Sequence, residues 1–244
     1  LKTFVNTVKG ETFADIADGP DWTKLQARAE PYAPGTVPRG GVVLTAGADV
    51  QDNRIELEVV AWGRRHESWS VDYRVFHGDP SQPDVWRRMD DLMAEHFPTE
   101  AGAALPIARL AIDTGHRTQD VLAWCARHPQ DRVMAIKGRD NLETPIGTAT
   151  PADVRPRDGR RQRSGVRLWP VGVSLLKARL FAWLGQPAPD DDAPMPLGWC
   201  HFPAHDREWF KQLTAERKVK RKTRHGYIRH EWEKIRARNE ALDC

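Results

Sequence analysis

Two apolar stretches that end abruptly in an aspartate constrain the fold of this chain more than any other feature. Residues 42–48 (VVLTAGA) and 110–112 (LAI) favour buried β-strands, and Asp49 and Asp113 follow them directly. A carboxylate taken out of water must be compensated by hydrogen bonds, a partner charge or a metal ion. An Asp after a short strand is most often a turn or cap residue. Asp49 and Asp113 can therefore form one site only if their two strands are neighbours in one sheet.

The order of the predicted elements indicates that they are neighbours. Three strands separated by short turns predict an antiparallel meander, and their ranges are 42–49, 54–62 and 68–76. In the second strand the apolar residues alternate with Arg54, Glu56 and Glu58, which predicts one face in water.

Helices and strands alternate after the meander. We predict helices over 81–97, 118–127, 174–184, 206–216 and 233–244, strands that end at 113, 138 and 171, and a hairpin over 218–232. This order is that of a ribonuclease H-like α/β fold, in which an antiparallel meander is followed by parallel strands and the mixed sheet is flanked by helices. Such a sheet places Asp49 beside Asp113.

Composition excludes several protein classes. With 29% charged and 40% hydrophobic residues the chain resembles a globular protein, and no apolar run is long enough to cross a membrane. Three scattered cysteines favour a reducing compartment over a disulfide framework. Residues 1–40 are rich in Pro, Gly and Asp and predict a linker or arm before a domain over 41–244. The chain begins as if in mid-protein, so we expect a fragment of a longer one.

Carboxylate oxygens are the ligands that Mg²⁺ and Mn²⁺ prefer, and two such ions can hold both the attacking water and the leaving oxygen of a phosphodiester. A ribonuclease H-like site needs a further acid from a later helix, for which Asp243 is the first candidate. Glu240 is a substitute one helical turn earlier, and Asn239 lies on the same helical face. Glu216 is a weaker candidate for a fourth acid, since the end of a helix is usually solvated.

Positive charge gathers in the second half, although the net charge is only +3. Two clusters, over residues 155–167 and 216–230, favour a phosphate-bearing partner such as double-stranded DNA. The lysines at 218, 220 and 222 would share one strand face. The alternative is a solvated edge strand protected by lysines. The candidate DNA-binding residues are Arg160, Arg161, Arg163, Lys218, Lys220, Lys222 and Arg224.

Several motifs resemble, in order, those of the large terminase subunits of tailed bacteriophages, in the lambda-like branch. They are FVNTVKGETF (4–13), LTAGADVQDNRIELEVVAWG (44–63), LAIDTGHRT (110–118), AIKG (135–138), LKARLFAWL (176–184), HFP (201–203), QLTAE (212–216) and NEALDC (239–244). The resemblance implies a nuclease domain with two Mg²⁺ or Mn²⁺ ions held by Asp49, Asp113 and Asp243.

The resemblance also implies that the domain cuts concatemeric viral DNA in the host cytoplasm. The partners implied are double-stranded DNA, the small terminase subunit, the portal or procapsid, and an ATPase domain of the same protein. No G-x-x-x-x-G-K-[ST] motif occurs here, so we expect no ATP hydrolysis.

Rival interpretations rest on single features. Lys137 suits a restriction-type nuclease, but the required acid position is Ala135. It could still sit near the scissile phosphate. Cys200, His201 and His205 suggest zinc, but no second ligand cluster completes a tetrahedral site. A junction resolvase or transposase would share the fold and metal chemistry, and a non-catalytic DNA-gripping or portal-docking module would explain the basic clusters.

Overall fold

The computed structural model describes residues 15–16, 19–155, 162–190, 193–222 and 227–244. The strands of its large sheet are β2 (Val43–Val50), β3 (Arg54–Trp62), β4 (Ser68–His77), β5 (His96–Pro98), β6 (Ala104–Asp113), β7 (Val133–Arg139), β8 (Thr150–Val154), β9 (Gln162–Gly172) and β10 (Cys200–His201). A second sheet holds β1 (Asp15–Ile16), β11 (Glu216–Lys222) and β12 (Ile228–Lys234). The helices are α2 (Trp22–Ala27), α3 (Pro83–Ala94), α4 (Thr118–Cys125), α5 (Val173–Leu184), α6 (Arg207–Leu213) and α7 (Glu240–Asp243), with a 3₁₀ turn at Arg64–His66.

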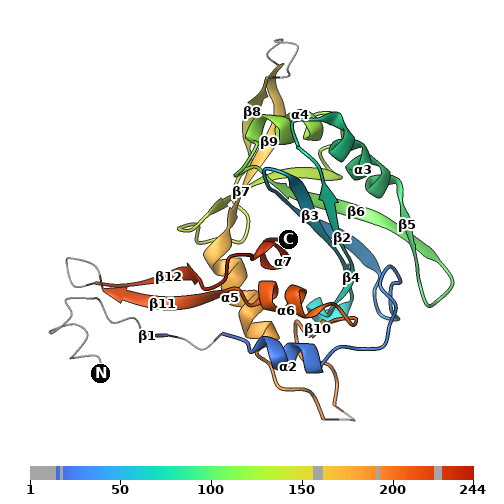
Figure 1. Cartoon of the computed structure of the whole chain (residues 1–244), viewed down its shortest axis with the longest axis vertical. Helices are drawn as coiled ribbons and strands as arrows, with labels where there is room; N and C mark the ends of the chain where they lie inside the picture. The colour runs from blue at the N-terminus through green and yellow to red at the C-terminus, as the bar shows by residue number, and fades with distance from the viewer. Residues whose placement is uncertain (1–14, 17–18, 156–161, 191–192, 223–226) are drawn as a thin grey trace.

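The large sheet is mixed and runs in the order β10-β4-β3-β2-β6-β7-β9-β8, with β5 paired to β6 (Figure 1). β2, β3 and β4 pair antiparallel, as the meander predicts. β2, β6, β7 and β9 then pair in parallel. The fold class expected from the sequence is therefore confirmed, and the architecture is consistent with a ribonuclease H-like sheet.

One face of the large sheet is covered by α3 and α4 over an apolar cluster. In α3, Pro83 starts the helix and the buried residues Val85, Met89 and Leu92 lie on one side of it. They pack against strand residues such as Leu57 and Ile112 in the main core. This face has the composition of an ordinary hydrophobic core.

The opposite face carries a second layer, and here one prediction is wrong. Glu56 and Glu58 of β3 were expected in water, yet their exposed fractions are 0% and 5%. α2, α6 and α7 form a second apolar cluster, which includes Phe210 of α6, on this side of the meander. Strand alternation alone cannot reveal such a layer, because its helices lie far from β3 in the sequence: α2 precedes the meander, and α6 and α7 follow β3 by more than 100 residues.

The C-terminal segment also differs from the predicted helix over 233–244. Lys234 is still in β12, where it pairs with Glu216, and the backbone N–H of Ile235 donates to Ala215 at 2.7 Å. Helix begins only at Glu240. Pairing with β11 has overridden the helical propensity of this stretch.

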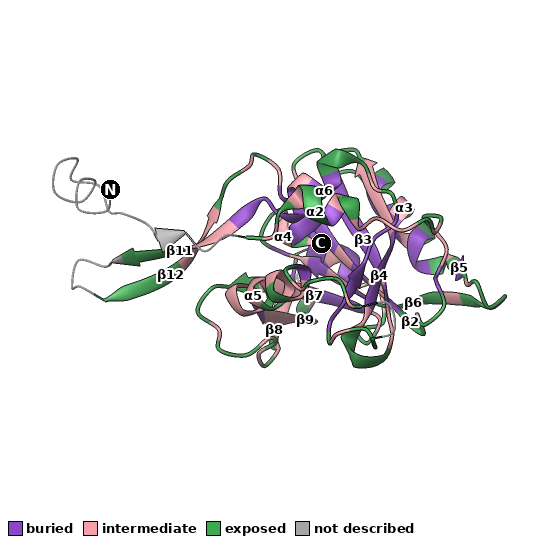
Figure 2. Cartoon of the chain, turned by 90° about the horizontal axis from the view of Figure 1, so that it is seen from below, coloured by how far each residue is buried: buried purple, intermediate pink, exposed green. Residues whose placement is uncertain are grey.

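The β11–β12 hairpin projects from the body of the molecule (Figure 2). Within the segment expected as an arm, residues 22–27 form α2, and Leu25 is buried in the second core. Residues 4–13, which carry the first terminase-like motif, lie outside the described residues. None of the described helices has the length and apolar character needed to span a membrane.

Candidate active site

The two aspartates lie side by side at the C-terminal ends of two neighbouring central strands, β2 and β6. Ala48 of β2 pairs with Ile112 of β6 in parallel register, so Asp49 and Asp113 are the next residues on neighbouring strands. Their side chains share the face opposite the main core. Asp113 opens a tight turn in which the backbone N–H of Gly115 donates to its Oδ2 at 2.8 Å.

Asp49 carries the more perturbed carboxyl group. Its exposed fraction is 8%, and Gln51 Nε2 donates to its Oδ2 at 2.5 Å. Burial raises the pKa of Asp49 to about 6, and the negative charges of Asp243, Asp113 and Glu240 act in the same direction. The hydrogen bond from Gln51 offsets part of this effect. Negative charge therefore accumulates here beyond what the described protein groups compensate.

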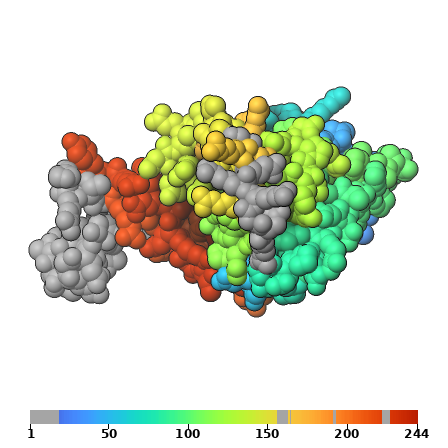
Figure 3. Space-filling model, turned by 90° about the horizontal axis from the view of Figure 1, so that it is seen from above, coloured from blue at the N-terminus to red at the C-terminus, as the bar shows by residue number. Residues whose placement is uncertain are grey.

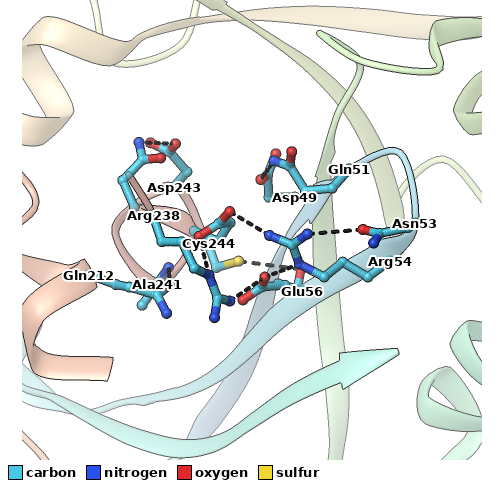
Figure 4. A network of polar contacts seen from close by, with 12 residues as sticks. Asp49, Gln51, Asn53, Arg54, Glu56, Gln212, Arg238, Ala241, Asp243 and Cys244 are labelled. Carbon is cyan, nitrogen blue, oxygen red and sulfur yellow. Dashed lines mark hydrogen bonds and ion pairs between the residues drawn. The ribbon is translucent and has the colours of Figure 1, made fainter. Parts of the chain in front are cut away.

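Asp243 reaches the same area from the C-terminal turn (Figure 4). The backbone N–H of Asp243 donates to Asn239 at 3.1 Å, and that of Cys244 to Glu240 at 2.9 Å. Gly47 of β2 permits this approach, because a Cβ there would collide with the carbonyl group of Cys244. The C-terminal turn, predicted as the end of a helix over 233–244, is thus packed against the central strand, and its Leu242 is buried.

A lysine that the sequence did not single out holds Asp243. Lys177 of α5 has a side chain 12% exposed, and its Nζ lies 2.8 Å from Asp243 Oδ1 and 2.7 Å from Glu216 Oε1. Asn239 Nδ2 donates to both carboxylates, at 2.6 Å to Asp243 and 2.9 Å to Glu216. Glu216, expected at a solvated helix end, starts β11 and is 7% exposed. Burial raises the pKa of Asp243 despite the opposing charge of Lys177.

The carboxylate of Glu240 forms ion pairs with two arginines, so it is not an unpaired acid beside Asp49 and Asp113. Arg54 Nη2 donates to its Oε1 at 2.7 Å, and Arg238 Nε donates to its Oε2 at 3.3 Å. The same arginines bind Glu56, which also accepts a hydrogen bond from Tyr73. These acids and arginines form a compact network beside Asp49 (Figure 4). In the sequence, the only sign of this network was the presence of charged residues such as Arg54 and Glu56 on the otherwise apolar strand β3.

The remaining candidate ligands lie elsewhere. Lys137 follows Ile136, the residue paired with Asp113, so strand alternation directs it to the other face. His201 contacts Glu30 at 2.6 Å and Glu67 at 2.9 Å, which accounts for both ring nitrogens without zinc. Within the described ranges, no three His, Cys, Asp or Glu side chains are grouped as a metal site.

The candidate DNA-binding residues fall into three groups. Arg163 is exposed on β9. Arg160, Arg161 and Arg224 lie outside the described residues, as does the side chain of Lys222. Lys218 and Lys220 are on β11.

The two faces of the hairpin differ in how their charges are paired. Arg217 and Arg221 form ion pairs with Glu233 at 2.6 and 3.1 Å. Lys218 and Lys220 alternate with these arginines, and neither forms an ion pair with any residue the structure describes. β11 lies between β1 and β12, so these lysines are not on the edge strand of the second sheet. Figure 3 shows the surface hollowed between this orange-red segment and the yellow-green strands.

Comparison with known proteins identifies relatives over the whole chain. The family model described as "Terminase large subunit gpA, endonuclease domain" matches residues 1–244. The terminase large subunit of Escherichia phage lambda is 33% identical over 249 residues, and that of Enterobacteria phage P21 is 31% identical over 251 residues.

Each of these two matches covers 100% of this chain but only 37% of the relative. No solved structure matches the chain. The family model and the strand-end acids agree in pointing to a nuclease, and the chain belongs to the family of endonuclease domains of phage terminase large subunits.

Proposed function

We propose that this chain is a metal-dependent endonuclease that hydrolyses phosphodiester bonds of double-stranded DNA at the edge formed by Asp49 and Asp113. The observation that carries the proposal is the convergence of these acids on adjacent parallel strands. Burial, together with the nearby charges of Asp243 and Asp113, raises the pKa of Asp49 to about 6. Clustered carboxylates of this kind attract cations, and a metal-dependent nuclease needs its cations at the point where DNA is cut.

The donor set fits hard divalent cations. Asp49 and Asp113 offer carboxylate oxygens, which Mg²⁺ and Mn²⁺ prefer over nitrogen or sulfur. Asp243 is the third donor, and it is the one whose present ion pair with Lys177 would have to loosen. Glu240 is bound by Arg54 and Arg238, so we do not include it among the ligands.

The residues around these acids have separate tasks. Two divalent ions bound there would supply an activated water and stabilise the leaving oxygen. Gln51 orients Asp49, and the Gly115 N–H fixes Asp113. Lys177 and Asn239 hold Asp243, which joins the C-terminal turn to the base of the hairpin through Glu216. Lys218 and Lys220, on β11 of the hairpin, contact DNA phosphates.

The match to terminase large subunits supports a role for this activity in DNA packaging. We propose that the domain acts on concatemeric viral DNA to produce genome ends, within a longer protein. The partners expected there are a small terminase subunit, the portal or procapsid, and an ATPase domain. The evidence for this is the match to terminase large subunits, of which this chain spans 37%.

Replacing the strand-end acids tests the proposed catalytic site. Asp49→Asn and Asp113→Asn remove ligand charge at nearly constant volume, so plasmid cutting in Mn²⁺ should be lost while the far-ultraviolet spectrum stays native. The affinity of each variant for Mn²⁺, measured by calorimetry, should also fall. Asp84→Asn is the matched control, because Asp84 lies on α3, which covers the other face of the sheet, and its side chain is 73% exposed.

Addition of EDTA should stop cutting by the wild-type protein. If either Asn variant cut plasmid at the wild-type rate, or if cutting were undiminished in EDTA, the proposed site would be wrong. Tight DNA binding with no cutting under any metal would favour the non-catalytic DNA-gripping module.

The hairpin prediction is tested by salt dependence. Replacing Lys218, Lys220 and Lys222 by Ala should weaken DNA binding and reduce the slope of log affinity against log salt by about 2 to 3, because each phosphate contact contributes about 0.9. Lys24→Ala with Lys211→Ala is the control, since both lysines lie outside the hairpin, on α2 and α6. An unchanged slope would show that the hairpin lysines do not contact the DNA backbone.

A further inference from the structure

Trp169 of β9 differs from the other nine tryptophans of the chain. Eight of those nine have a ring or a cation packed against the indole, as for Trp22 with Arg207 and Trp232 with Phe181. The ninth, Trp62, donates a hydrogen bond to Thr45. Trp169 has neither kind of partner among the residues that the structure describes.

Trp169 also lies in one row with the candidate catalytic acids. Asp113 pairs with Ile136 of β7, and Ile136 pairs with Trp169. Residues paired across strands point to the same face, so the indole is on the face of Asp113 (Figure 1 shows the order of β6, β7 and β9). Two strand spacings separate them, which amounts to about 10 Å.

Two adjoining hollows open beside the indole. Both are lined by Trp169, Arg167 and Ile146, and one of them extends to Arg109. Ile146 is 51% exposed, and Asp131 contributes one carboxylate against the two guanidinium groups. The result is an aromatic surface with a net positive rim on the open half of the active-site face.

An indole beside guanidinium groups suits a nucleobase and its phosphate. Aromatic side chains bind bases by stacking, which works for any base whose face is free. Within an intact duplex those faces are covered by neighbouring base pairs, so a base must be unpaired before it can stack on a side chain. At about 3.4 Å per stacked nucleotide, about 10 Å corresponds to about three nucleotides of one strand.

We propose that the surface formed by Trp169, Arg167 and Arg109 binds an unpaired DNA base within about three nucleotides of the phosphate held at Asp49 and Asp113. This inference rests on the proposed function, since it takes the acids as the place where a DNA strand is held. It adds that the strand is locally unpaired there. Trp169 stacks on the base, and the two arginines bind the adjoining phosphates.

Binding without cutting tests the proposal. Fluorescence anisotropy in EDTA compares a labelled duplex with the same duplex containing a short central unpaired stretch. The wild-type protein should prefer the unpaired form, and Trp169→Ala should lose at least about fivefold in affinity for that form, because one stacked base contributes about 1–3 kcal/mol. Trp169→Phe should retain most of the affinity. Trp22→Ala is the control variant, because Trp22 packs against Arg207 and does not line either hollow.

Abasic nucleotides test the same contact from the DNA side. An abasic position within the unpaired stretch should weaken binding by the wild-type protein but not weaken binding by Trp169→Ala further, because the two changes remove one contact. Trp169→Leu, which fills the space without a ring, replaces the Ala variant if that variant unfolds.

Equal affinity of wild type and Trp169→Ala for the unpaired form, or fully additive losses, would overturn this inference and leave the proposed nuclease intact. A wild-type protein that binds neither DNA in EDTA would overturn this inference, whereas the proposed nuclease is decided separately by plasmid cutting in Mn²⁺.

Discussion

Around β2 and β3 both faces of the large sheet are buried, but the two faces are chemically opposite. Under α3 and α4 the strands present side chains such as Leu57 and Ile112, both 0% exposed. Under α6 and α7, strands β2 and β3 present Asp49, Glu56 and Glu58, which are 0 to 8% exposed. One layer is a hydrophobic core, and the other is a core built around acids.

The difference shows what each face contributes. Burial of apolar surface stabilises a fold by about 25 cal/mol per Å². Burial of carboxylates costs free energy unless partners compensate it, and the compensation here is uneven. Glu56 has Arg54, Arg238 and Tyr73, whereas Asp49 has one hydrogen bond from Gln51 and several negative neighbours. The fold therefore rests mainly on the first face and keeps uncompensated charge on the second.

Leu57→Ala should have the largest effect on stability. Leu57 is completely buried in the apolar face of β3, so truncation leaves a cavity that should cost about 2–5 kcal/mol of unfolding free energy. The cost should be the same at about pH 5 and about pH 8, since no charge changes. Urea unfolding measures it, with Val60→Ala on the opposite side of the strand and only partly buried as the control. A loss below about 1 kcal/mol would show that this face is not the main source of stability.

The apolar face is also the part that the sequence predicted best. Periodic apolar residues predicted β3 to the residue and α3 and α4 within a few residues at each end, because burial against one layer leaves a period of two or 3.6 in the chain. The neighbourhood of Asp49 and Asp113 followed from strand order alone.

The acidic face was only partly predictable. Lys177 meets Asp243 and Glu216 through packing between segments far apart in the sequence, and no local pattern encodes that meeting. Glu58 alternates with apolar residues like any solvated side chain, until α6 covers it with Trp209. The predicted C-terminal helix began too early for a different, local reason: β12 continues to Lys234, which pairs with Glu216 at the start of the neighbouring strand β11.

Two glutamates on the acidic face should respond to pH in opposite directions. Burial raises the pKa of Glu58 to about 7, although Ser70 and Trp209 donate hydrogen bonds to it. Burial would also raise the pKa of Glu56, but hydrogen bonds from Tyr73 and Arg54 and the charge of Arg238 outweigh it and hold that pKa below its usual value.

Glu58→Gln should therefore gain stability relative to wild type as the pH rises. A carboxyl whose pKa is higher in the folded state than in the unfolded state stabilises fully below the unfolded value of about 4.3, and this contribution is lost as the pH rises through about 7. The amide never ionises, so the difference between variant and wild type should shift in favour of the variant by up to about 3 kcal/mol between about pH 4 and about pH 8. Glu56→Gln is the matched control with the opposite sign, because a lowered pKa stabilises above the unfolded value and is lost as the pH falls. Unfolding free energies measured in urea across this range decide the matter. Parallel pH profiles for the two variants would show that these neighbouring acids share one environment and that the contrast between them is wrong.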